Sequence, residues 1–253
     1  MLYLRPVRKT EIIMGMPITI EVVDVVSDNI FDQIFGYFKE VDNRFSTYKR
    51  SSEISLFNKG TIKKEMISKD LDEILKLSQK TKEETFGYFD IKKKNGRFDP
   101  SGIVKGWSIR NGAQKMLKAG YSNFFIEAGG DIEAHGKPKD MSYFRVGIRN
   151  PFDINAIVKV IKLKDMGIAT SGTYIRGQHI YNPLNYKKAD EIASISVIGP
   201  DVYEADRFAT AAFAMGVRGI NFIENMVGFE AYMIDKKGIA TLTSKFERYT
   251  VHA

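Results

Sequence analysis

The chain has 253 residues, of which 43% are hydrophobic and 12% aromatic, and this composition is typical of a folded globular protein. It contains no cysteine, which excludes disulfides, thiolate metal sites, iron–sulfur clusters and cysteine nucleophiles. The formal net charge of +7 comes from lysines that favour solvated helix faces, with a patch that binds polyanions as the alternative.

The first half of the chain predicts a strand pair followed by helices. The segment 12–23, IIMGMPITIEVV, is typical of two strands that turn at Gly15. Three helices are expected from apolar residues at helical spacing, at residues 28–41, 68–84 and 102–120. Asp70 and Glu73 have the spacing of a capping box for the second helix, and Gly120 ends the third.

The second half is dominated by extended segments. Strands are predicted at residues 123–128, 144–149, 156–163, 192–199, 229–235 and 239–244, the last two as a hairpin. One helix, 203–216, stands among them. Because strands outnumber helices and many are adjacent, we expect an α+β fold with a largely antiparallel sheet. No linker or repeat divides the chain, so a single domain over residues 1–253 is expected.

The helix at 203–216, YEADRFATAAFAMG, carries two oxygen ligands on a surface that is otherwise small and apolar. Asp206 and Thr210 are four residues apart, so both side chains project from one face. Such a pair is suited to bind a hard cation, and a side-chain hydrogen bond within the helix is the alternative.

Two loops in the first half carry residues suited to a nucleotide. Tyr48 lies among small hydroxyl residues, which indicates either a ring-stacking platform for a planar ligand or a surface loop. The segment 98–107, FDPSGIVKGW, opens a helix with glycines, and Lys105 in it is suited to neutralise phosphate. A turn with ordinary capping explains the same segment equally well.

Two further loops lie in the second half. Gly129 and Gly130 directly follow a strand and permit either a close backbone approach to a ligand or a tight turn. Ser171 and Gly172 offer a hydrogen bond and space for a ligand. His179 is the only histidine in such a setting, and a structural histidine is the alternative interpretation.

In their order along the chain, these segments resemble the ApbE-like family of flavin transferases, which cut FAD and attach its FMN half to a threonine of a protein. The resemblance covers most of the chain, and its most specific parts are DPSGIVKGW and ADRFATAAFAMG. The remaining parts are Met14–Gly15, STYKRSSEISLFN, Phe89–Asp90, AGGDI, ATSGTY and HIYNP. It implies the family's T-fold-related architecture.

The resemblance also implies a site. Mg²⁺ is expected on Asp206, Thr210 and the main-chain carbonyl of Val104, and the oxygen-only donor set suits that ion. His179 is expected to act as a base or to position phosphate, with Asp206 and Asp131 as competing bases. The residues expected to bind the flavin nucleotide are Met14, Tyr48, Tyr88, Phe89, Asp90, Lys105, Ser171, Gly172 and His179.

The expected activity is therefore Mg²⁺-dependent transfer of FMN from FAD to an acceptor flavoprotein. A FAD pyrophosphatase and a non-catalytic FAD-binding protein are the alternatives, and no motif favours a nucleic-acid partner. Arg110 stands where the family usually has an aspartate, and a contact with phosphate is one interpretation of it.

No transmembrane segment or signal peptide is recognised, so a cytoplasmic location is expected. A periplasmic or membrane-anchored location is the alternative if the chain was trimmed.

Overall fold

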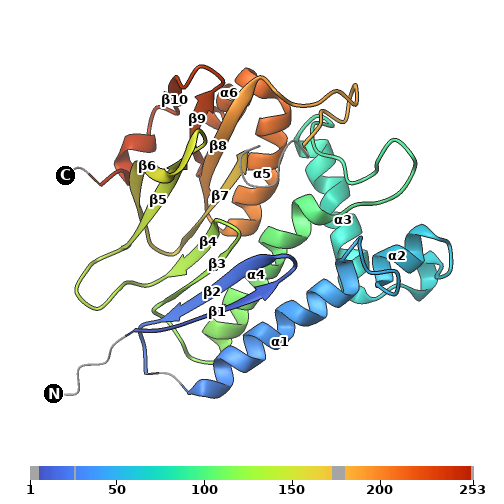
Figure 1. Ribbon diagram of the computed structural model, residues 1–253, viewed down its shortest axis with the longest axis horizontal. Coiled ribbons are helices and arrows are strands. Elements are labelled where there is room, and N and C mark those ends of the chain that lie inside the picture. Colours follow the sequence, from blue (N-terminus) through green and yellow to red (C-terminus); the bar gives the residue numbers. More distant parts are fainter. Residues whose placement is uncertain (1–5, 26, 173–179, 252–253) are drawn as a thin grey trace.

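The computed structural model describes residues 6–25, 27–172 and 180–251, and it is built around one antiparallel sheet. The order in this sheet is β1-β2-β3-β4-β7-β8-β9-β10 (Figure 1). Its strands are β1 (Val7–Ile13), β2 (Met16–Val22), β3 (Phe124–Ala128), β4 (Asp131–His135), β7 (Met166–Gly172), β8 (Ile192–Gly199), β9 (Glu230–Asp235) and β10 (Ala240–Leu242). Every neighbouring pair is antiparallel, which confirms the α+β prediction.

Helices cover one face of this sheet. The helices are α1 (Asp28–Phe45), α2 (Glu53–Asn58), α3 (Lys69–Glu84), α4 (Ser101–Lys118), α5 (Val202–Ala214) and α6 (Gly219–Glu224). Phe31 and Phe38 of α1 join Ile109 of α4 in a fully buried cluster over β2 and β3. Phe208 and Phe213 of α5 bury their rings in a second cluster with residues of β7, β8 and β9. A continuous apolar core thus fixes both α4 and α5 to the sheet.

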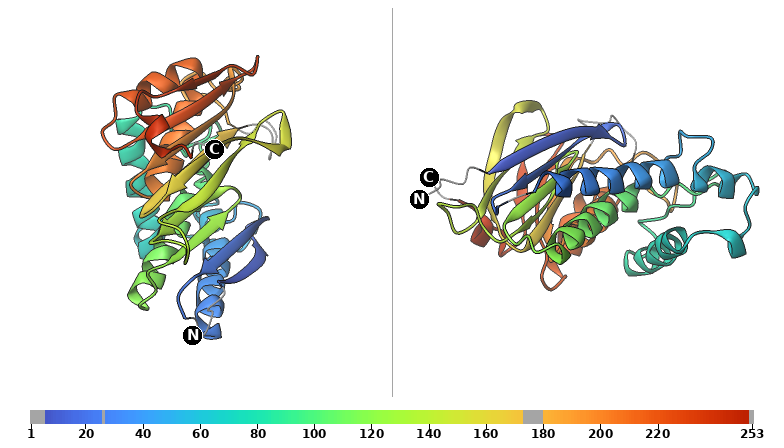
Figure 2. Two further views of the ribbon diagram at one scale, coloured as in Figure 1. Left: turned by 90° about the vertical axis from the view of Figure 1, so that its left-hand side faces the viewer. Right: turned by 90° about the horizontal axis from the view of Figure 1, so that it is seen from below.

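The opposite face of the sheet is partly covered by a separate hairpin of β5 (Phe144–Asn150) and β6 (Asp153–Leu163). Phe144, Val146 and Ile148 alternate with exposed residues along β5 and face inward. They pack in a third cluster with side chains of β4, β7, β8 and β9. Figure 2 shows the helices and this hairpin on opposite sides of the sheet. Because the hairpin covers only part of this face, a space remains between β5 and the strands β1 and β3.

A fourth apolar cluster lies between helices and not against the sheet. Ile54 of α2 and Leu71 and Ile74 of α3 pack around Trp107 of α4. The α2–α3 region consequently projects beyond the sheet and forms one wall above the N-terminal end of α4 (Figure 2). No helix of the described residues is long and apolar enough to cross a membrane.

The structure corrects two details of the sequence predictions. The cap of α3 is Ser68, whose hydroxyl accepts a hydrogen bond from the Leu71 N–H at 3.1 Å, and not the expected box of Asp70 and Glu73. Asp70 instead pairs with Arg44 of α1. Strands β4 and β7 were not expected, because their short, glycine-flanked and hydroxyl-rich sequences are also typical of loops.

Candidate active site

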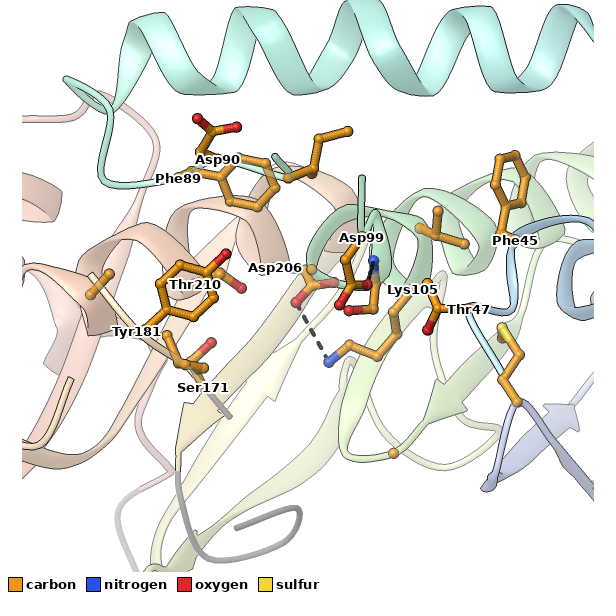
Figure 3. A pocket seen from close by; sticks show the side chains of 18 of the residues that line it. Phe45, Thr47, Phe89, Asp90, Asp99, Lys105, Ser171, Tyr181, Asp206 and Thr210 are labelled. Atoms are coloured by element: carbon orange, nitrogen blue, oxygen red, sulfur yellow. Dashed lines mark hydrogen bonds and ion pairs between the residues drawn. The ribbon is translucent and has the colours of Figure 1, made fainter. Parts of the chain in front are cut away.

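A pocket of about 410 Å³ opens where the helices meet the β1–β2 turn, the β3–β4 turn and the end of β7 (Figure 3). Its walls come from the β1–β2 turn, the C-terminal end of α1, the segment before α4, the first turns of α4, strand β7 and helix α5. All the expected site residues that the structure describes line it: Met14, Tyr48, Tyr88, Phe89, Asp90, Val104, Lys105, Ser171, Gly172, Asp206 and Thr210. His179 lies outside the described residues, so its place is not described.

Asp206 is the most enclosed polar residue that α5 contributes to this pocket. Its side chain is almost fully buried, and Oδ2 accepts a hydrogen bond from the Gly106 N–H at 2.9 Å. Its Oδ1 lies 3.5 Å from the Lys105 ammonium (Figure 3). Burial raises the pKa of Asp206 to about 7, while Lys105 opposes this shift and the charge of Asp131 adds to it.

The position of α5 is fixed by close contacts at its N-terminus. Glu133 of β4 accepts a hydrogen bond from the Val202 N–H at 2.6 Å, so a carboxylate lies at the positive end of the helix. Burial raises the pKa of Glu133, and His135 opposes that shift. A Cβ at Gly167 would lie 2.0 Å from the Val202 nitrogen, so only glycine lets β7 pass under this helix end. These contacts hold Asp206 at the base of the pocket.

Lys105 forms ion pairs within the protein that the sequence did not indicate. Its ammonium contacts the carboxylate of Asp131, which is fully buried, as well as that of Asp206. Asp131 also accepts a hydrogen bond from the Thr170 N–H at 3.1 Å, which ties the start of β4 to β7. Two acidic side chains and one lysine thus meet beneath the pocket. The sequence signal for Asp131 is an acid directly after two glycines at the start of a strand.

The segment before α4 supplies a charged rim. Asp90 accepts a hydrogen bond from the Lys92 N–H at 2.8 Å and pairs with Lys82 at 2.7 Å. Lys93 and Asp99 form an ion pair at 2.6 Å. Burial by itself raises the pKa of Asp99, but the hydrogen bond and charge of Lys93 outweigh it and hold that pKa below its usual value. Asp90 and Asp99 on this rim therefore each form an ion pair with a lysine of the protein.

Aromatic side chains surround the opening. Tyr48 is 96% exposed although it lines the pocket, so its ring has a free face for a planar ligand. Tyr181, which sequence analysis missed, lines the same pocket and stacks on Tyr186 with 6.1 Å between ring centroids. The Tyr88 hydroxyl accepts a hydrogen bond from Arg218 at 2.9 Å. A single tyrosine in a loop gives no sequence signal that would place it here.

Arg110, for which a contact with phosphate was one interpretation, is not among the described residues that line this pocket. Its guanidinium lies 4.4 Å from the centroid of the Tyr203 ring and 3.9 Å from the Glu73 carboxylate. The arginine faces the packing between α3, α4 and α5, because it stands on the side of α4 away from Lys105. The arginine in place of the aspartate that is usual in the family therefore adds no charge to the lining of the pocket.

The donor atoms at the base of the pocket suit a hard divalent cation. The Asp206 carboxylate, the Thr210 hydroxyl and the Val104 residue that offers a carbonyl all line it. No cluster of three or more histidine, cysteine, aspartate or glutamate side chains that could hold a metal occurs among the described residues. Mg²⁺ binds few protein ligands and fills its other coordination positions with water and phosphate oxygens, and this donor set fits that preference.

Comparison with known proteins identifies the family that shares this pattern. The model of the ApbE family matches residues 14–95 and 91–233. A FAD:protein FMN transferase of Haemophilus influenzae is 24% identical over 90% of this chain and 85% of its own length. The FAD:protein FMN transferase of Vibrio cholerae is 30% identical, over 47% of this chain and 38% of that protein.

Solved structures share the fold over the whole chain. The flavin transferase ApbE from Vibrio cholerae has a TM-score of 0.86 at 22% identity, and the match covers 97% of this chain and 99% of the other. The ApbE protein from Thermotoga maritima has a TM-score of 0.87 at 18% identity, with coverage of 98% and 100%. The helical and hairpin layers described above are therefore features of this fold.

Proposed function

The chain belongs to the ApbE family, and on this premise we propose that it is a FAD:protein FMN transferase. The observation that carries the proposal is the single pocket in which the expected residues from separate segments meet. The names of the curated relatives support the same activity. The volume of about 410 Å³ lies within the range of pockets that hold cofactors.

The proposed reaction transfers the FMN half of FAD to a hydroxyl of another protein, for which we propose a threonine. The hydroxyl oxygen forms a bond to the phosphorus of the FMN half, and the bond from that phosphorus to the bridging oxygen breaks. AMP leaves with the bridging oxygen, and the hydroxyl proton passes to a base. We propose His179 for this base from its sequence context.

The base of the pocket is proposed to hold Mg²⁺ through Asp206, Thr210 and the Val104 carbonyl. When bound, the ion neutralises the charge of the pyrophosphate that is cleaved. Lys105 places a positive charge beside both Asp206 and Asp131, and so keeps the two buried carboxylates in place. The Gly106 N–H orients Asp206 Oδ2, which leaves Oδ1 directed toward Lys105.

The rim is proposed to bind the two ends of FAD. Tyr48 offers an exposed ring face for stacking, and Met14 stands in the β1–β2 turn beside it. Asp90 lies in the segment before α4 with its carboxylate fixed by a backbone N–H, and we assign it to the adenine end. Ser171 and Gly172 end β7 at the pocket and add hydrogen-bonding groups.

The proposal is tested by incubating the protein with FAD and a threonine-containing acceptor protein and analysing the nucleotides by chromatography. AMP is expected to appear when Mg²⁺ is present and to be absent when EDTA replaces it. Free FMN formed together with AMP in the presence of an acceptor would instead support a FAD pyrophosphatase. FAD that binds and stays intact would contradict both enzymatic functions.

A further inference from the structure

A second cavity, of about 460 Å³, lies on the face of the sheet that the helices do not cover. Its floor includes Arg8 of β1, Phe125 and Glu127 of β3, and its wall is formed by β5 with Arg145 and Gly147. We call this cavity the β5 groove. It is comparable in size to the first pocket, and none of the expected site residues lies in it.

The β5 groove and the pocket meet at the β3–β4 turn. Gly129 and Thr170 line both cavities, and Gly130 lines the groove. Both glycines of the turn have positive φ, and a Cβ at Gly130 would meet nothing within 4 Å. The turn thus carries no side chain and has open space beside it. A chain that lies in the groove can pass over this turn toward the base of the pocket.

The edge of β5 that faces the groove has unused backbone groups. The Val160 carbonyl of β6 accepts a hydrogen bond from the Val251 N–H at 2.8 Å. The backbone carbonyl of Val160 is therefore directed away from β5. Val160 is directly opposite Gly147, and residues opposite one another in an antiparallel pair point either both inward or both outward. Gly147 therefore directs its N–H and carbonyl away from β6. Among the described residues, β5 pairs with no strand except β6.

We propose that the β5 groove binds an extended segment of the acceptor protein. The segment adds as a strand to the free edge of β5 and carries its hydroxyl over the Gly129–Gly130 turn into the pocket. This inference rests on the proposed transferase function, because it assigns the place of that reaction's second substrate. It accounts for an open strand edge next to a cavity that joins the nucleotide pocket.

Three arginines and two glutamates line the groove, so its lining has a net positive charge: Arg8, Arg145, Arg149, Glu21 and Glu127. Arg145 is exposed on the wall and has no ion-pair partner among the described residues. Arg8 is paired with Glu21, with 3.9 Å between the charged atoms. An acidic side chain next to the target hydroxyl would pair with Arg145. We therefore assign to the groove a segment with acidic residues beside its acceptor hydroxyl.

The test uses synthetic peptides that share a central threonine and have randomised flanks, with FAD and Mg²⁺, and detects flavin-labelled peptides by mass spectrometry. Gly147→Pro removes the N–H at the free edge without removing a bond of the β5–β6 ladder. Gly147→Ala is the matched control, because it places the same Cβ about 2.9 Å from Ile157 and keeps the N–H.

Gly147→Pro is expected to lower labelling at limiting peptide about fivefold or more relative to Gly147→Ala, the scale of one lost hydrogen bond plus a clash with the incoming strand. Arg145→Glu is expected to remove the preference for acidic flanks that the parent shows. FAD affinity, measured by flavin fluorescence, is expected to be unchanged in all three variants.

Equal labelling by the Pro and Ala variants, or an unchanged flank preference in Arg145→Glu, would overturn the groove assignment while the parent's transfer upholds the proposed function. A parent that releases AMP from FAD but labels no peptide would contradict both, because neither a transfer to a hydroxyl nor a binding site for an extended segment would then be present.

Discussion

Lys105 shows how a single residue acquires a role that its neighbours in sequence do not reveal. It stands in a glycine-flanked helix start that is typical of phosphate binding, but its ammonium contacts Asp131 and Asp206. Both carboxylates are buried, and each unpaired buried charge costs several kcal/mol. The lysine compensates these charges, so the pocket base keeps two acids close together. Replacing any member of this group changes the charge that the other two experience.

Asp206→Asn tests the cation site proposed at the base of the pocket. The amide keeps an oxygen that can accept from the Gly106 N–H, but it removes the anionic ligand. Mg²⁺-dependent AMP release is expected to fall at least about a hundredfold, since a bound cation supplies several kcal/mol of charge stabilisation. Asp42→Asn is the control, because Asp42 lines the pocket with its own partner Lys49. Unchanged AMP release in Asp206→Asn would place the metal elsewhere.

Tyr48→Ala tests the flavin platform. The ring is almost fully exposed, so its removal leaves the fold unchanged and affects only ligand contacts. FAD affinity is expected to weaken by about 1 kcal/mol, the scale of one aromatic stack, and flavin fluorescence titration measures it. Tyr143→Ala serves as the control outside the pocket. Equal affinities of the two variants would reduce Tyr48 to a surface residue.

His179→Asn tests the proposed base. Single-turnover FMN transfer at saturating FAD and acceptor is expected to slow by about 10²–10⁴-fold, the range of general-base catalysis, with little change in FAD affinity. The effect is confined to the transition state if the histidine moves the proton or positions the phosphate. A rate within about threefold of the parent would leave His179 without a catalytic role.

At the scale of elements, the crossing of α4 and α5 determines the geometry of the pocket base. The absence of a side chain at Gly106 permits this crossing, because a Cβ there would lie 2.8 Å from the Asp206 Cβ and 2.9 Å from the Val202 carbonyl oxygen. Glycine at this position lets the helices approach until the Gly106 N–H reaches Asp206. The same contact that packs the helices thus orients the carboxylate.

Gly106→Ala is therefore expected to destabilise the protein by about 1–3 kcal/mol, because the added methyl must push the backbone of α5 away. It is also expected to lower Mg²⁺-dependent AMP release by displacing Asp206. Gly36→Ala in α1 is the matched control, since its Cβ would meet nothing within 4 Å. That control is expected to stabilise by about 0.5–1 kcal/mol. Chemical denaturation measures both, and equal stabilities would contradict the close crossing.

Across the whole molecule, the helices and strands that could be predicted were those with a clear periodicity of apolar residues. The apolar stripe at 28–41 predicted α1, which buries Phe31 and Phe38, and the alternation at 144–149 predicted β5. Strand β7 was missed, because its two glycines and Ala169 have low strand preference and pairing with β4 and β8 makes it extended. Contacts between distant segments, such as Glu133 with Val202, leave no local pattern.

The residues that line the candidate site were predicted from the sequence, but most contacts between their side chains were not. Family resemblance selected residues from separate segments, and the structure brings those that it describes to one pocket. It did not indicate that Lys105 pairs with Asp131 or that Arg110 stacks on Tyr203, because both depend on how helices and strands are oriented. The roles assigned to the pocket residues remain predictions that the variants above test.

The activity proposed for this pocket is transfer of the FMN half of FAD to a protein hydroxyl. The most direct measurement incubates the protein with FAD, Mg²⁺ and a threonine-containing acceptor, weighs the intact acceptor by mass spectrometry and quantifies AMP in the same sample. Each labelled acceptor is expected to gain one FMN group in ester linkage, with one AMP released for each. AMP and free FMN beside an acceptor of unchanged mass would contradict the proposed activity.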